Sequence, residues 1–256
     1  MKSIPVIKFF RHIRKKLLGE GSTKKYFFYA IGEIVLVVIG ILIALQINNS
    51  NEGRKDRVYE QKILTEIKNS LEKDLGRTKF LIEGRVTLKE KRIHRIIKTI
   101  LFNATDHDTI QFQKNLKDIG LTLSFSYDKG PYESLKSIGL DKIKNDSLRS
   151  ALVRFYEVAM PLRIIFVNHN KDLNEIERRG YYKDLVYYES IKQIKSKSTF
   201  SIVKKTDLKT IRNHPSFIKY IELEKSVAAN YRIRLEHAVK QFEEIISHIN
   251  SVLNND

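Results

Sequence analysis

Residues 26–45 read YFFYAIGEIVLVVIGILIAL, and this stretch dominates the organisation of the chain. It contains one charged side chain, Glu33. As a helix, residues 26–47 would be about 33 Å long, close to the ~30 Å hydrocarbon core of a bilayer. We therefore predict a single transmembrane helix over residues 26–47, in contact with membrane lipids.

Three alternatives explain this stretch less well. A buried core helix seldom contains an apolar run as long as residues 34–45. A cleaved signal peptide needs a small-residue cleavage site, which the sequence after Leu42 lacks. A helix lying on the membrane surface needs a polar face, which this stretch also lacks.

The charges on either side of the stretch predict its orientation. Residues 1–25 contain eight Lys and Arg side chains against one acid, a net charge of +7, whereas residues 52–57 carry three bases and two acids. The positive-inside rule then places the N-terminus in the cytoplasm and residues 48–256 on the other side of the membrane. Apolar residues recur at helical spacing within residues 1–25, so we expect this leader to lie on the anionic inner leaflet.

Glu33 and three small residues are the candidate functional residues of the span. A carboxyl group at this depth is a functional candidate by default, although snorkelling, protonation or pairing with a preceding lysine also explains it. Gly32, Gly40 and Ala44 lie on one face, and small residues four apart allow two helices to approach closely. A homodimer through the span and a chance spacing are the two open interpretations.

Composition limits what the remaining ~200 residues can be, although their number suffices for a domain with its own core. The whole chain has 11 Gly and 4 Pro, too few for a turn-rich sandwich or barrel. It has no Cys, which excludes disulfides, thiolate zinc sites and cysteine nucleophiles. Residues 50–256 carry a net charge of +11, which predicts salt-dependent attraction to anionic partners.

Apolar periodicity predicts a mainly α fold, an antiparallel helical bundle with long helices over residues 48–256. We expect helices over residues 54–102, 147–178 and 215–253, with Asn145 or Asp146 as the cap of the second. The first should bury an apolar stripe that comprises Ile63, Ile67, Leu71, Leu75, Ile82, Ile93, Ile97 and Leu101. The third has Pro215 in its first turn and a seam in alternating steps of three and four that comprises Ala228, Tyr231, Leu235, Ala238, Phe242, Ile245, Ile249 and Val252. In the second helix, which Pro161 should kink, apolar positions recur in alternating steps of four and three. That seam comprises Leu148, Leu152, Phe155, Ala159, Leu162, Phe166, His169, Leu173 and Ile176.

The region between the first two helices, residues 103–144, is predicted to be irregular. A short helix over residues 132–138 should end at Gly139, where glycine suits a helix C-terminus. Residues 121–125 and 200–203 alternate weakly between apolar and polar, which predicts that they pair as strands.

No recognised motif predicts catalysis. The sequence lacks a Gly-rich phosphate loop, a nucleophile elbow and an HExxH pattern, so we expect no catalytic residue, metal or cofactor. Tyr132, Glu133 and Ser134 form the most distinctive patch outside the long helices, and we expect it to cap the bundle, with a pocket as the alternative. One face of the last helix carries four residues at ligand spacing, for which a solvated face is favoured over a metal site: His237, Gln241, Glu244 and His248.

Three phrases of the sequence carry a family resemblance. They are KFFRHIRKKLL at residues 8–18, YAIGEIVLVVIGILIALQINN at residues 29–49 and PYESLKSIGLDKIKNDSLR at residues 131–149. Together they resemble a family of uncharacterised single-pass membrane proteins of Gram-negative bacteria, a domain-of-unknown-function family. The resemblance implies a periplasmic location for the bundle and carries no activity over to any residue.

These features favour an envelope interaction, scaffold or sensor-like module held by one span. The first alternative is a bundle that faces the cytoplasm and binds nucleic acid or anionic lipid through its basic surface. The second is an enzyme whose site follows no recognised motif.

Overall fold

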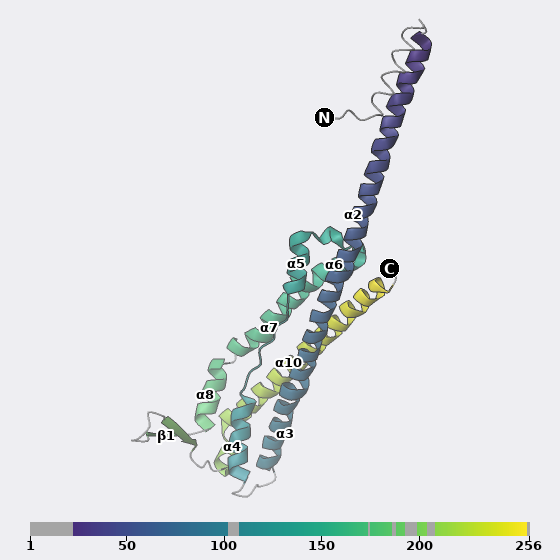
Figure 1. Cartoon of the computed structure of the whole chain (residues 1–256). Coiled ribbons are helices and arrows are strands. Elements are labelled where there is room, and N and C mark those ends of the chain that lie inside the picture. Colours follow the sequence, from purple (N-terminus) through teal and green to yellow (C-terminus); the bar gives the residue numbers. More distant parts are fainter. Residues whose placement is uncertain are drawn as a thin grey trace. The chain divides into compact units, whose positions relative to one another are not determined.

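The computed structural model describes residues 23–101, 108–173, 175–185, 188–192, 199–203 and 208–254. The described chain is mainly α-helical, as predicted (Figure 1). Its elements are α2 (Thr23–Leu81), the π-helix η1 (Ile82–Val86), α3 (Thr87–Leu101), α4 (Asp108–Ile119), α5 (Gly130–Ile138), the 3₁₀ helix η2 (Leu140–Lys142), α6 (Asp146–Val153), the π-helix η3 (Arg154–Ala159), α7 (Met160–Leu173), α8 (Glu175–Leu185), β1 (Tyr188–Lys192), β2 (Thr199–Val203), α9 (Leu208–Arg212) and α10 (Pro215–Leu253).

The chain divides into two compact units, residues 1–59 and residues 60–256. In the first unit, the most apolar part of α2 has none of its residues buried. Within the described residues, one helix is long and apolar enough to cross a membrane, and it contains this stretch. The predicted leader lies almost entirely in residues 1–22, outside the described residues.

The second unit is an antiparallel helical bundle in which α10 lies against η1, α3, α6, α7 and α8. Two ion pairs show the direction of α10 relative to the segment from α2 to α3. Lys89 of α3 pairs with Glu224 of α10, whereas Lys79, earlier in the chain, pairs with the later Glu243 at 2.7 Å. Because the two partners move in opposite directions along the chain, the two helical segments are antiparallel.

The prediction for the last helix is confirmed in bounds and in seam. Helix α10 begins at Pro215, and the His214 side chain caps it by accepting a hydrogen bond from the Ser216 amide at 3.2 Å. The three-and-four spacing of apolar residues is buried as expected, and only its last member, Val252, is half-buried. The buried members are Ala228, Tyr231, Leu235, Ala238, Phe242, Ile245 and Ile249.

The seam predicted for residues 147–178 is correct at its start and wrong beyond Phe155. Asn145 caps α6 as predicted, and its Oδ1 accepts a hydrogen bond from the Leu148 amide at 2.9 Å. The π-helix η3 then takes more residues per turn than an α-helix, so the buried positions continue at Tyr156, Met160 and Val167. Three residues of the predicted seam are exposed instead, Leu162, Phe166 and Ile176.

The same irregularity occurs in the first long segment. Helix α2 buries Ile63, Ile67 and Leu71 as predicted. Beyond η1, Ile93 is buried as predicted, whereas the next buried positions, Ile96 and Ile100, each lie one residue before the predicted Ile97 and Leu101.

The region predicted to be irregular contains helix α4, which the sequence reasoning missed. Three of its residues, Phe112, Leu116 and Ile119, join a core cluster with side chains of α3, α8, α9 and α10. The short helix α5 ends at Gly139 as predicted, and the φ of +134° there suits glycine because a Cβ would lie 2.4 Å from the Asp141 carboxyl. The strand prediction is half wrong: residues 199–203 form β2, but their antiparallel partner is β1 and not residues 121–125.

Candidate functional site

The residues predicted to act in the span all lie on the part of α2 that belongs to the first unit. Glu33 is half-buried, whereas Gly32, Gly40 and Ala44 are exposed. A Cβ placed on Gly32 or Gly40 would meet nothing within 4 Å. This face of α2 therefore has room for a closely approaching neighbour.

The patch of Tyr132, Glu133 and Ser134 lies in the first turns of α5. The Tyr132 ring is buried and stacks on Tyr156 of η3, with ring centroids 4.4 Å apart and planes 10° apart. Glu133 and Ser134 are exposed, and the Ser134 hydroxyl donates to the Gly130 carbonyl at 3.0 Å. Burial, with Glu157 and Glu133 nearby, raises the pKa of Tyr132 to about 12. The packing of Tyr132 fits the capping interpretation.

A buried carboxylate attaches the segment before α5 to α2. Asp74 Oδ2 accepts a hydrogen bond from the Asp128 amide at 2.7 Å, and the Ser70 hydroxyl donates to the Asp128 carboxylate at 2.9 Å. Arg77 lies 3.2 Å from the other Asp74 oxygen. Burial raises the pKa of Asp74, although the Asp128 amide and Arg77 oppose the shift.

Two further predictions concern side chains on the helices. Among the described residues, no three His, Asp or Glu side chains are grouped so that they could hold a metal ion. On the face of α10 that carries residues at ligand spacing, Gln241 accepts a hydrogen bond from Arg163 at 2.7 Å. The sequence favours a packed connector at Tyr181 and Tyr182 over stacking on a ligand, and both side chains pack against the core cluster. Asp106 and His107, for which the sequence favours a solvated turn over a ligand cluster, lie outside the described residues, and so does the side chain of His169.

The structure brings together a buried ionic cluster that the sequence reasoning did not identify. Glu224 of α10 is 0% exposed and accepts hydrogen bonds from Lys89 of α3 and Arg178 of α8. The Lys89 ammonium also donates to the Ile119 carbonyl at the end of α4. Because one carboxylate joins three helices and one lysine reaches a fourth, the cluster ties four helices of the bundle together.

The cluster contains more positive than negative charge. Lys89 and Arg178 share the single carboxylate of Glu224, and Arg178 Nη2 is buried without a hydrogen-bond partner among the described residues. Burial lowers the pKa of Lys89 and Arg178 adds to this, while Glu224 opposes it. Burying a net charge is unfavourable unless a counter-charge is near.

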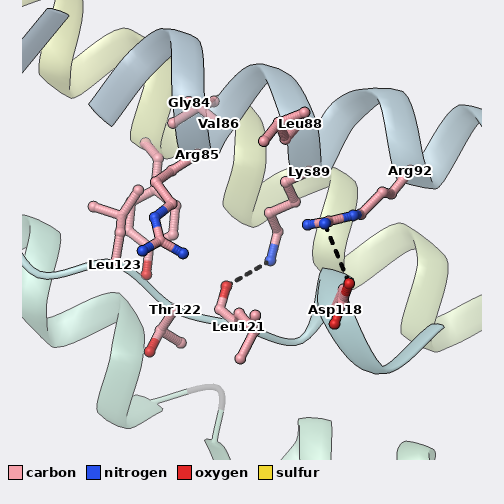
Figure 2. Close-up of a pocket in the computed structure, with 11 residues that line it drawn as sticks. Gly84, Arg85, Val86, Leu88, Lys89, Arg92, Asp118, Leu121, Thr122 and Leu123 are labelled. Atoms are coloured by element: carbon pink, nitrogen blue, oxygen red, sulfur yellow. Dashed lines mark hydrogen bonds and ion pairs between the residues drawn. The ribbon is translucent and has the colours of Figure 1, made fainter. Parts of the chain in front are cut away.

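Lys89 also forms one wall of a pocket (Figure 2). The pocket has a volume of about 140 Å³ and lies between η1, the start of α3, the end of α4 and the extended residues 121–123, with Tyr231 of α10 behind. The long 3.4 Å contact from Lys89 Nζ to the Leu121 carbonyl crosses it. The pocket therefore opens beside the buried cluster.

Two arginines complete the pocket lining. Arg85, Lys89 and Arg92 occur at helical spacing, and Figure 2 shows all three leaving the helix on the side of Asp118 and residues 121–123. Arg92 pairs with Asp118 at 3.2 Å. Arg85 is exposed and makes no hydrogen bond or ion pair with any described residue. The lining thus holds three cations and one carboxylate.

A signal for the cluster is present in the sequence. Glu224 occupies a seam position of α10, between Ile221 and Ala228 in steps of three and four, and Lys89 lies between the buried Val86 and Ile93. A charged residue within an apolar seam indicates either a buried ion pair or an error in the seam. Only the tertiary structure shows which residues meet.

Comparison with known proteins gives one family. A family model described as "Family of unknown function (DUF6090)" matches residues 33–211. The match includes Lys89, Arg178 and the pocket residues of η1, α3 and α4, and it ends before α10 and Glu224. No curated protein and no solved structure matches the chain. The resemblance to a family of unknown function is therefore confirmed.

Proposed function

The chain belongs to this family of unknown function (DUF6090), and we propose that it is a single-pass membrane protein whose bundle serves as an interaction, scaffold or sensor-like module of the bacterial envelope. One observation carries the proposal. Helix α2 is a single element from Thr23 to Leu81, and it contains both the unburied apolar stretch and the first buried residues of the bundle. An element shared in this way can hold a rigid domain at a membrane.

In the proposed orientation, the N-terminus lies in the cytoplasm and residues 48–256 lie in the periplasm, at the inner membrane. The net charge of +7 on residues 1–25 supports this orientation, and the same charge supports contact with the anionic inner leaflet. The mixed charges of residues 52–57 are what the rule expects on the translocated side.

The topology is tested by protease accessibility of a C-terminal tag, in spheroplasts of a Gram-negative host with the inner membrane intact. Digestion of the tag, with a cytoplasmic marker protected, is expected. Protection of the tag, with digestion only after lysis, would refute the orientation. Salt-dependent binding of the basic bundle to nucleic acid or anionic lipid would then become the leading function.

The proposal includes a homodimer through the face that bears Gly40 and Ala44. Their exposure and the open space beside Gly40 support it, because close helix packing in a membrane needs small residues. Sedimentation in detergent should give a dimer for the full chain and a monomer for Gly40→Ile. A matched change at Gly53, which lies outside the span and has nothing within 4 Å of an added Cβ, should leave the dimer intact. Equal masses for the chain and Gly40→Ile would exclude this interface.

A further inference from the structure

We infer that the pocket beside Lys89 binds a phosphate-type dianion. Its lining carries a net positive charge, because it contains three cations, Arg85, Lys89 and Arg92, and one carboxylate, that of Asp118. Of the three cations, Arg92 pairs with Asp118. Behind Lys89, the charges of Glu224 and Arg178 offset each other. Two positive charges therefore remain for a ligand, which favours a doubly charged oxyanion over a singly charged one.

The hydrogen-bond donors suit the same ligand. The Arg85 guanidinium has all its donors available to a ligand, because it bonds to no described residue. Arg92 uses one nitrogen on Asp118 and keeps others. Guanidinium groups match the paired oxygens of phosphate, and hydrogen bonds between ionised groups are the stronger kind.

Lys89 contributes charge more than donors. Two of its three N–H groups are directed to Glu224 and to the Ile119 carbonyl. The third makes only the 3.4 Å contact with the Leu121 carbonyl, which a phosphate oxygen in the pocket would replace. A bound dianion would also supply the counter-charge that the buried cluster lacks.

The size of the pocket limits the ligand. A volume of about 140 Å³ is several times what one water molecule needs, and it lies well below the roughly 300–1,000 Å³ typical of pockets for drug-sized molecules. It therefore admits either free phosphate or the terminal phosphate of a monoester whose remainder lies outside. These two sources share one recognition chemistry, and the test below separates them.

The test is isothermal titration calorimetry on the full chain in nonionic detergent, at constant ionic strength adjusted with sodium chloride. The probes are inorganic phosphate, glycerol 3-phosphate and acetate. One phosphate ion per chain should bind saturably, and more tightly than acetate. Binding of both phosphates would indicate that the pocket takes a terminal phosphate group, and binding of inorganic phosphate alone would indicate a site for the free ion; either supports the proposal.

Variants distinguish the pocket from general attraction to a basic protein. Arg85→Gln should weaken phosphate binding about tenfold or more, as expected for loss of hydrogen bonds between ionised groups. Because Arg85 is exposed and unpaired among described residues, the variant should retain the helical circular dichroism of the parent. Arg95→Gln, an exposed arginine of α3 outside the pocket, is the matched control and should bind normally. Absence of saturable phosphate binding, or equal weakening by both variants, would overturn the proposal.

Discussion

Replacing Glu224 by Gln should destabilise the bundle more than almost any other single polar change. Glu224 is 0% exposed, and it provides the carboxylate for both Lys89 and Arg178, whose side chains are 6% and 8% exposed. A glutamine has one acceptor oxygen and no charge, so two buried cations would lose their counter-charge. Removing one partner of a buried ion pair costs about 3–5 kcal/mol, and we expect a loss in that range.

Urea unfolding of the full chain in nonionic detergent, followed by far-UV circular dichroism, measures this loss. With a denaturant dependence of about 2–3 kcal/mol/M, the midpoint should fall by about 1–2.5 M. Glu222→Gln removes an exposed carboxylate two residues away and should change the free energy of unfolding by less than about 0.5 kcal/mol. A loss below about 1 kcal/mol for Glu224→Gln would refute the reasoning, because it would mean that the two cations find water or another anion.

Two further predictions concern close packing and pH. Gly120→Ala should lower the free energy of unfolding by about 1–3 kcal/mol, because the new Cβ would lie 2.6 Å from the hydroxyl of the buried Tyr220. The loss should be smaller when Tyr220→Phe is also present, and additive losses of the two changes in urea unfolding would contradict this reasoning. Burial raises the pKa of Asp74 above 3.8, so the folded state binds this proton more tightly than the unfolded state does. The contribution of Asp74 to stability therefore falls as pH rises above 3.8. The free energy of unfolding of Asp74→Asn, minus that of the parent, should therefore grow as pH rises above 3.8, and a constant difference would exclude the titration of Asp74.

Helix α10 shows how far local pattern can predict this fold. Its bounds follow from Pro215 at the first turn and from an uninterrupted three-and-four repeat, so nothing outside the segment was needed. The end of α5 at Gly139 was predictable for the same reason, because glycine is common just after the last turn of a helix.

The buried stripe beyond Phe155 was not predictable from the apolar repeat. The π-helix η3 lies there, and a repeat counted along the sequence assumes that every turn holds the same number of residues. Pro161 lies two residues after the end of η3 and has no amide hydrogen for the carbonyl of Glu157, which accounts for irregularity near this point. The other π-helix, η1, contains Gly84, a poor helix former, but Ile93 beyond it is buried as predicted.

By itself, the sequence determined the properties that depend on neighbours along the chain: a helix apolar enough to cross a bilayer, the charge asymmetry around it, a mainly helical fold and several helix ends. The tertiary structure decided which charges became buried together. Lys89 and Arg178 lie 135 and 46 residues from Glu224, and the pocket adds Asp118 of a helix that the sequence reasoning missed. Hydrophobic periodicity states which face of each helix is buried, but it does not state which helices meet or at what register. The charge of a site assembled from four helices is therefore a property of the packing.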